Sequence, residues 1–421
     1  MLPMRIALLG PFSGPSLLSV FGTALGGQKL PPGYPGAPLM ATLAKALVDR
    51  GHEVAAITTD YSTPMAELEP FRKVTGRGIE AYFCPQRPHS FRSAGGRRGR
   101  ALDLFLFERN CLRSAIADYA PDVVHAHWTY EFAWAALDSG LPTLTTAHDS
   151  PGKVLRYMPQ PYRLLRYLMA RRVLARCSHL TTVSPALAHD LRSLTRAHTE
   201  VVPNPIAEDV LDTPGCDAAS FDGKTVAMVL NGWGALKNGA NALRAFALAR
   251  QQEPSLRLVC FGSGFHSDGP AFEWARTHGL SDGVEFRGPV PHRAILERLR
   301  ASMLLLHPSR LESFGMSVAE AMAVGLPAVA GRSTASMPWL LDDGRAGALV
   351  DVNDPRAIAR ELVALSRDRS RWQALSSAAR VRARQLFAAS AVAARYEEVY
   401  SALLPQGSRR TFSELVDVVQ A

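Results

Sequence analysis

The chain has 421 residues, 47% of them hydrophobic and 20% charged, and a formal net charge of +9 at pH 7. This length is too great for a single hydrophobic core, so we expect two domains of roughly 200 residues each. No apolar run approaches the ~18 residues that a membrane-spanning helix requires, which argues against an integral membrane protein.

Charge and cysteine content narrow the partners and the compartment. The positive charge favours anionic partners, but no motif combines aromatic and basic residues as nucleic-acid-binding proteins do, so no nucleic-acid partner is expected. The five cysteines are scattered and lack metal-site spacing. Such cysteines are typical of a reducing compartment, and we expect a cytoplasmic protein. The start, MLPMRIALLG, fits a strand better than a signal peptide.

The first half of the chain alternates predicted strands with helical patterns. Residues 5–10 (RIALLG) predict a strand, and residues 37–51 predict a helix because their leucines recur at helical spacing. Further strands are predicted at residues 52–60, 121–127, 142–149 and 179–184. Alternation of this kind predicts an α/β domain with a mostly parallel sheet.

The alternation stops at residues 202–224, a stretch rich in proline, glycine and aspartate that predicts a linker. It then starts again, with strands predicted at residues 225–232, 256–264, 284–290, 303–309 and 327–331. We therefore expect two Rossmann-like, doubly wound domains that face each other across a cleft. Their predicted bounds are residues 1–205 and 206–385. A helical segment, residues 386–421, is expected to pack back on the first domain.

One helical stretch contains a charge that needs a partner. In MSVAEAMAV, residues 316–324, Glu320 is surrounded by apolar neighbours. A helix that is apolar all round is a buried helix, and a buried glutamate needs a cation or a ligand. Just ahead of this helix, Glu312 occupies the predicted strand-to-helix loop, where free backbone N–H groups favour anions and Gly315 permits close approach of a ligand.

These residues form a motif. The stretch PSRLESFGMSVAEAMAVGLPAVA, residues 308–330, resembles the donor-site signature of retaining glycosyltransferases of the GT-B fold, glycosyltransferase family 4. Two glutamates separated by seven residues are the hallmark of this signature. The resemblance extends over most of the chain. It includes LAKALVDRGHEV, PDVVHAHW, TLTTAHD, VSPALAHDL, VVPNPI and DDGRAGALVDVNDP, in the family's order.

The resemblance implies roles for the residues of the donor loop. Glu320 would bind the ribose hydroxyls of a nucleotide-sugar, and Glu312 would contact the transferred sugar. Ser313, Phe314 and Gly315 would lie beside the donor, with their N–H groups towards its phosphate or hydroxyls. The alternative for both glutamates is an ion pair with an arginine such as Arg310 or Arg332.

Lys237 matches the family's phosphate-binding lysine, and a cation suits the negative charge of a departing nucleoside diphosphate. Many relatives carry an arginine five residues ahead of this lysine, where this chain has Gly232. Lys237 would then act alone or with another basic residue; a surface lysine without a role is the alternative. Gly262 and Ser263, in the sequence GSG, either border the nucleotide or form an ordinary turn.

The first domain would bind the acceptor. His148 in TAHD matches a histidine near the reacting sugar in relatives, and His127 in HAHW is a second candidate. Either histidine could instead bond within its own domain. The family's glycine-rich acceptor loop is replaced by GGQKLPPGYPGAP, residues 26–38, in which Gly36 is the nearest equivalent.

We therefore predict a cytoplasmic, retaining glycosyltransferase that moves a sugar from a nucleotide-sugar to a glycan or lipid-linked acceptor in bacterial surface polysaccharide biosynthesis. No metal or other cofactor is expected, since the chain has no Asp-x-Asp motif. Residues 161–177 could rest on an anionic membrane surface or form an ordinary packed helix. Two alternatives remain, a non-catalytic glycan-binding or assembly protein and a sugar-nucleotide 2-epimerase.

Overall fold

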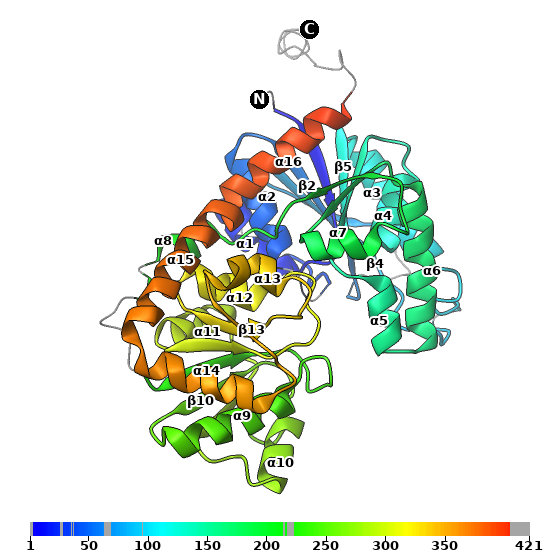
Figure 1. Cartoon of the computed structure of the whole chain (residues 1–421). Coiled ribbons are helices and arrows are strands. Elements are labelled where there is room, and N and C mark those ends of the chain that lie inside the picture. Colours follow the sequence, from blue (N-terminus) through cyan, green and yellow to red (C-terminus); the bar gives the residue numbers. More distant parts are fainter. Residues whose placement is uncertain are drawn as a thin grey trace, which may run out of the picture. The chain divides into compact units, whose positions relative to one another are not determined.

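The computed structural model describes residues 3–404 except 26–27, 35, 37, 63–68, 95, 214 and 217–222. The chain divides into two compact units (Figure 1). The N-terminal unit contains the described parts of residues 1–182, 191–202 and 393–421, and the C-terminal unit contains residues 183–190 and 203–392. The chain thus passes between the units at 202/203 and at 392/393, in addition to the short excursion at 183–190. The predicted boundaries were 205/206 and 385/386.

The N-terminal unit is built on an eight-stranded sheet with the order β3-β4-β2-β1-β5-β6-β7-β8. All neighbouring strands are parallel except β3 and β4. The strands are β1 Arg5–Leu9, β2 Glu53–Asp60, β3 Arg72–Thr75, β4 Ile79–Pro85, β5 Val123–His127, β6 Thr143–Ala147, β7 His179–Thr182 and β8 His198–Val201. The helices are α1 Leu18–Phe21, α2 Leu39–Asp49, α3 Leu106–Tyr119, α4 Glu131–Leu137, α5 Pro151–Tyr157 and α6 Pro161–Arg176.

The C-terminal unit is built on a six-stranded sheet with the order β11-β10-β9-β12-β13-β14, in which every pair is parallel. The strands are β9 Thr225–Val229, β10 Arg257–Phe261, β11 Val284–Gly288, β12 Leu304–His307, β13 Ala328–Gly331 and β14 Ala348–Val350. The helices that lie wholly or mostly in this unit are α7 Pro185–Leu191, α8 Glu208–Asp212, α9 Gly239–Gln252, α10 Pro270–Thr277, α11 His292–Arg300, α12 Met316–Ala323, α13 Met337–Leu340, α14 Pro355–Arg367 and α15 Arg369–Phe387.

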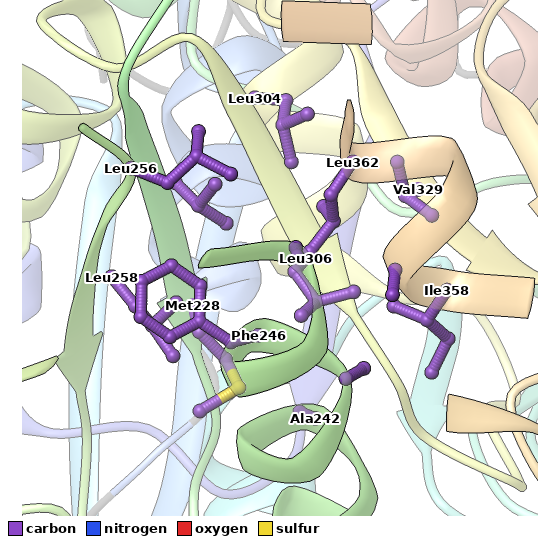
Figure 2. Close-up of a cluster of buried hydrophobic side chains, with 14 of the residues drawn as sticks. Met228, Ala242, Phe246, Leu256, Leu258, Leu304, Leu306, Val329, Ile358 and Leu362 are labelled. Atoms are coloured by element: carbon purple, nitrogen blue, oxygen red, sulfur yellow. The ribbon is translucent and has the colours of Figure 1, made fainter. Parts of the chain in front are cut away.

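The core of the C-terminal unit explains why its strands read as continuous apolar runs. A parallel sheet is covered by helices on both faces, so both sets of alternating side chains are buried. Leu304 and Leu306 of β12 are buried together with Phe246 of α9 and Ile358 of α14 (Figure 2). Helices α9 and α14, green and orange in Figure 1, lie side by side.

The last helix, α16 Ala389–Leu403, begins in the C-terminal unit and continues in the N-terminal unit. In the N-terminal unit, the Glu397 carboxylate accepts hydrogen bonds from Arg50 Nε at 2.5 Å and from Arg50 Nη2 at 2.7 Å. Tyr400 bonds to the buried His125 at 2.7 Å. These contacts attach the end of the described chain to strands and helices near its beginning. None of the described helices is both long and apolar enough to cross a membrane.

Candidate functional site

Two loops at the carboxyl edge of the C-terminal sheet are joined to each other. They follow β9 and β12, which are neighbours in the sheet. The backbone N–H of Arg310 donates to Leu236 O at 2.8 Å, and the Asn238 side-chain amide donates to Pro308 O at 3.1 Å. Ligands bind at the carboxyl ends of strands in doubly wound sheets. This pair of loops, residues 230–238 and 308–315, is therefore the candidate site of the C-terminal unit.

The joined loops bring two of the predicted site residues into contact. Lys237 Nζ lies 2.5 Å from Glu312 Oε1, and His307 Nε2 lies 3.3 Å from the same oxygen. Burial raises the pKa of Glu312, but His307 and Lys237 outweigh that effect and lower it to about 2. Glu312 is therefore ionised at neutral pH. The alternative in which an arginine pairs with Glu312 is wrong, because its cation is Lys237.

The loop that carries Glu312 is fixed by its own backbone and by the segment around Ser336. Gly315 has a φ of +101°, and a Cβ added there would stand 2.5 Å from Met337 Cε. The Ser336 hydroxyl lies 2.8 Å from Phe314 O and 3.0 Å from Glu312 O. The Phe314 ring is buried against Phe387, with 5.5 Å between ring centroids. The side chain of Phe314 is thus an anchor of the loop.

Ser313 contributes to the same loop through its backbone. Its carbonyl oxygen accepts a hydrogen bond from the Ser184 hydroxyl at 2.6 Å. Ser184 directly precedes α7 and belongs to the C-terminal unit. The motif VSPALAHDL therefore helps to hold the donor-loop backbone, although it lies far from that loop in the sequence.

Glu320 lies in α12 with only 9% of its surface exposed. Its carboxylate oxygen Oε1 is 2.8 Å from His292 Nε2, at the start of α11. The hydrogen bond to Glu320 is the main reason that the pKa of His292 is raised. The proposed arginine partners are wrong: Arg310 bonds to Asn353 and Ala235, and Arg332 bonds to Leu349 O.

Sequence reasoning missed His292. It precedes Glu320 by 28 residues, and no spacing rule connects a residue of one helix to a residue of another. Its only signal was its place directly after a predicted strand, where a doubly wound fold collects ligand-binding groups.

The GSG turn lies against the loop that follows β9. Gly262 has a φ of +106°, and a Cβ there would stand 2.0 Å from Leu230 O. Gly232 N donates to Ser263 O at 3.0 Å, and the Ser263 side chain is exposed. Gly232 itself has a φ of +104°, a backbone conformation that strains any other residue. An arginine at this position, which the family resemblance led us to expect, would be strained in this conformation.

In the N-terminal unit, the two predicted histidines meet at the carboxyl ends of β5 and β6. His127 Nδ1 and His148 Nε2 are 2.9 Å apart, and the His148 ring stacks on Trp128 with 4.2 Å between centroids. Burial lowers the pKa of His148 to about 3 and the pKa of His127 well below its ordinary value. Both imidazoles are therefore neutral at pH 7, and one of the two facing nitrogens donates its hydrogen to the other.

Trp128 is a residue that the sequence analysis did not single out. Its φ of +65° is rare for a bulky side chain and costs free energy, and strain of this kind collects at functional sites. Gly36, the predicted acceptor residue, has a φ of +122° and open space around the position of a Cβ. Residues 26, 27, 35 and 37 of the same loop lie outside the described residues.

Buried polar atoms without a partner mark the same sheet edges. Eight side-chain atoms of the described residues are buried and lack a hydrogen bond. Five of them lie within two residues of a strand's carboxyl end: His127 Nε2, Thr129 Oγ1, Thr145 Oγ1, His307 Nε2 and Ser309 Oγ. Because such atoms are rare in folded proteins, they point to groups that a ligand or a moving side chain satisfies.

Comparison with known proteins identifies the family. Residues 218–382 match the family model described as Glycosyl transferases group 1, and residues 38–210 match the model Glycosyltransferase Family 4. The D-inositol 3-phosphate glycosyltransferase of Streptosporangium roseum is 30% identical over 386 residues, which cover 85% of this chain and 86% of the relative. The chain belongs to glycosyltransferase family 4. It is an enzyme that transfers sugars, and its two doubly wound units are those of the GT-B fold.

Two further comparisons place this family 4 glycosyltransferase among its relatives. The N-acetyl-alpha-D-glucosaminyl L-malate synthase of Bacillus anthracis is 24% identical over 395 residues, covering 88% of this chain and 94% of the relative. The crystal structure of HepE from Anabaena, in complex with UDP-glucose, has a similar fold, with a TM-score of 0.66. It is 17% identical and covers 95% of this chain and 100% of that chain.

Proposed function

We propose that this glycosyltransferase binds a nucleotide-sugar at the carboxyl edge of its C-terminal sheet and transfers the sugar, with retained configuration, to a hydroxyl of a glycan or lipid-linked acceptor. The observation that carries the proposal is the convergence of Lys237, Glu312 and His307 between two joined loops. The HepE structure, which holds UDP-glucose in a similar fold, supports a nucleotide-sugar as the donor.

Lys237 would bind the diphosphate of the donor. Its side chain is about a third exposed, which leaves room for a phosphate to approach the ammonium group. Departure of a nucleoside diphosphate concentrates negative charge on phosphate oxygens, and a fixed cation stabilises that charge in the transition state. Since Gly232 supplies no second cation, Lys237 carries this role among the residues that the family motif places around the phosphate.

Glu312 and Glu320 would bind hydroxyl groups of the two ends of the donor. An ionised carboxylate accepts hydrogen bonds only, which suits sugar hydroxyls. Glu312 would orient the transferred sugar, and Glu320 would bind the ribose. His292, hydrogen-bonded to Glu320 Oε1, would hold that carboxylate in place while its other oxygen bonds the ribose. Gly262 and Ser263 would border the nucleotide.

The acceptor would bind in the N-terminal unit. As a neutral imidazole, His148 is able to exchange hydrogen bonds with a sugar hydroxyl, and His127 would hold its ring from the other side. Gly36 and its loop would complete the acceptor side. The names of the relatives include an inositol phosphate and malate, so acceptors vary within the family. We propose that the reaction takes place in the cytoplasm as a step of surface polysaccharide biosynthesis. Helix α6 is a candidate for contact with an anionic membrane.

In the proposed mechanism the acceptor hydroxyl attacks on the face that the diphosphate leaves, and the departing phosphate takes the hydroxyl proton. Lys237 and the loop N–H groups would provide the positive charge that a metal ion supplies elsewhere. Treatment with EDTA is therefore expected to leave the rate of transfer unchanged. A loss of activity that Mg²⁺ or Mn²⁺ restores would overturn metal independence.

A donor panel tests the function. Thermal stabilisation by UDP-, GDP- and ADP-sugars identifies the donor, because a ligand at 100 times its dissociation constant adds about 2.7 kcal/mol of stability. Transfer from that donor to candidate glycans is then followed by NMR, with an α-linked product expected. Inverted anomeric configuration would contradict retention, and interconversion of the donor without an acceptor would indicate an epimerase instead.

A further inference from the structure

His307 is a buried histidine with an unmet hydrogen-bonding group beside the candidate donor site. It is the last residue of β12 and is 3% exposed. Its Nδ1 lies 3.3 Å from the Ser317 hydroxyl oxygen. Its Nε2 lies 3.3 Å from Glu312 Oε1, but forms no hydrogen bond with any described residue. A buried ring nitrogen left in this state costs free energy and requires an explanation.

The surroundings decide which ring nitrogen carries the hydrogen. The Glu312 carboxylate is ionised and can only accept, so a bare Nε2 lone pair facing it would be repelled. The Ser317 hydroxyl, by contrast, is able to donate to Nδ1. The hydrogen therefore belongs on Nε2, and it faces a carboxylate that is held slightly out of bonding geometry.

Lys237 is the closer of the two partners of this carboxylate. Its ammonium lies 2.5 Å from Oε1, the same oxygen that faces His307. When no donor is bound, the stronger partner for Oε1 is the ammonium. The proposed function requires Lys237 to bind the donor diphosphate, and an ammonium drawn towards phosphate leaves Glu312 without its nearest cation.

A carboxylate in this position cannot remain alone. Only 15% of the Glu312 side chain is exposed, and a mostly buried charge without partners is strongly unfavourable. The His307 N–H group lies close enough to bond to this carboxylate. It would not have to break a hydrogen bond to any other described residue to do so.

We propose that His307 is a positioning residue for Glu312. When the diphosphate takes Lys237, the Glu312 carboxylate closes onto the Nε2–H group of His307. A residue of a buried strand then fixes the carboxylate that orients the transferred sugar. This inference rests on the proposed role of Lys237. It adds that Glu312 exchanges Lys237 for His307 when the donor binds.

The first test needs no donor. The Lys237→Met variant mimics a lysine that has been drawn away, and NMR of protein labelled with ¹⁵N-histidine reports the Nε2–H proton of His307. We expect the resonance of this proton to shift downfield in Lys237→Met. In Lys237→Met/Glu312→Ala it should shift back towards its position in the parent protein. The loss of the signal in His307→Gln assigns it. An unchanged signal in Lys237→Met would overturn the proposal, whether or not the protein transfers sugar.

The second test is kinetic and uses the donor that the panel identifies. His307→Phe keeps the ring shape and removes the donor group, whereas His307→Gln places an amide N–H near the position of Nε2. We expect His307→Phe to lower kcat by roughly 10- to 100-fold with little change in donor KM, because the lost hydrogen bond goes to a charged group. His307→Gln is expected to recover most of that loss.

The variants also separate positioning from folding. Loss of folded enzyme would lower the apparent kcat of both variants, so kcat is referred to the folded fraction. Only a positioning role predicts that His307→Gln recovers what His307→Phe loses. Equal kcat in His307→Phe, His307→Gln and the parent protein would overturn the proposal. If the parent protein transfers no sugar from any donor, the proposed function fails. The NMR result still decides whether His307 donates a hydrogen bond to the Glu312 carboxylate.

Discussion

Glu320 is a buried carboxylate whose described partner is the half-exposed ring of His292. Replacement of Glu320 by glutamine keeps its shape but removes the charge from the position proposed to bind ribose. We expect Glu320→Gln to weaken binding of the donor by roughly 10- to 100-fold, the scale of hydrogen bonds to a charged group. Calorimetric titration measures this change. Glu273→Gln, on the exposed face of α10, is the matched control and should bind as the parent does.

Lys237 offers a second prediction at this scale, in which activity and stability separate. Lys237 is partly exposed, and His307 remains to receive the Glu312 carboxylate. Loss of the ion pair should therefore lower the free energy of unfolding by no more than about 1–2 kcal/mol. The same change, Lys237→Met, should lower kcat by roughly 10²- to 10³-fold, because it removes a cation aimed at developing charge. Lys45→Met, on the surface of α2, serves as the control. Full activity in Lys237→Met would remove this residue from the mechanism.

Candidate site residues could be picked out where a residue type was unusual for its surroundings or its spacing matched a family motif. A carboxylate inside an apolar helix signalled Glu320, and the spacing of the glutamates signalled Glu312. The contacts among them were not predictable, because they depend on how neighbouring strands order themselves. β9 lies next to β12 although two strands separate them in the chain, and only this adjacency brings Lys237 to Glu312.

At the scale of elements, tight turns shape the carboxyl edge of the C-terminal sheet. Gly262→Ala introduces both backbone strain and a methyl group 2.0 Å from Leu230 O. Gly344 has a similar φ of +97° with open space around it, so Gly344→Ala introduces strain alone. We expect about 1–2 kcal/mol of destabilisation for Gly344→Ala and about 3 kcal/mol or more for Gly262→Ala. Urea denaturation compares the two, and equal losses would contradict the close approach.

Most strands whose sequences are apolar on both faces were predicted, but the buried β4, Ile79–Pro85, was missed. The buried parallel strands β1, β2, β5 and β12 all stood out in this way. β3, Arg72–Thr75, did not, since its sequence RKVT has three exposed residues and one buried valine. It is an antiparallel strand at the edge of the sheet, where one face and one side meet solvent.

At the scale of the molecule, buried neutral histidines make stability depend on pH. Burial lowers the pKa values of His125, His127 and His148 below their ordinary value. The unfolded chain therefore binds protons that the folded chain does not. The stability from these groups is fully present above pH ~6.5 and is lost as pH falls towards the folded pKa values, by up to ~1.4 kcal/mol per pH unit for each histidine.

Thermal denaturation between pH 7.5 and pH 5 measures this dependence. We expect a falling melting temperature, with a shallower fall in His125→Phe, which removes one of the three groups. His125→Phe should also be less stable at pH 7.5, because Tyr400 and Thr146 each lose a hydrogen bond. His198→Gln is the control, since that side chain is 73% exposed. A melting temperature that does not fall with pH would contradict neutral burial of the cluster.

The boundary at 202/203 lies at the start of the stretch 202–224, where proline, glycine and aspartate interrupt the periodic pattern. The sequence did not predict that a short segment before this boundary belongs to the other unit. Residues 183–190 belong to the C-terminal unit although the chain returns to the N-terminal unit for residues 191–202. No change of composition marks this excursion, since it depends on contacts such as the one between Ser184 and Ser313.

The crystal structure of the protein with its nucleotide-sugar, or with the corresponding nucleoside diphosphate, is the most direct measurement. We expect the diphosphate within hydrogen-bonding distance of Lys237 Nζ and the ribose hydroxyls within hydrogen-bonding distance of Glu320. A nucleotide bound away from the carboxyl ends of β9 and β12, with both side chains out of its reach, would contradict the assignment of the donor site.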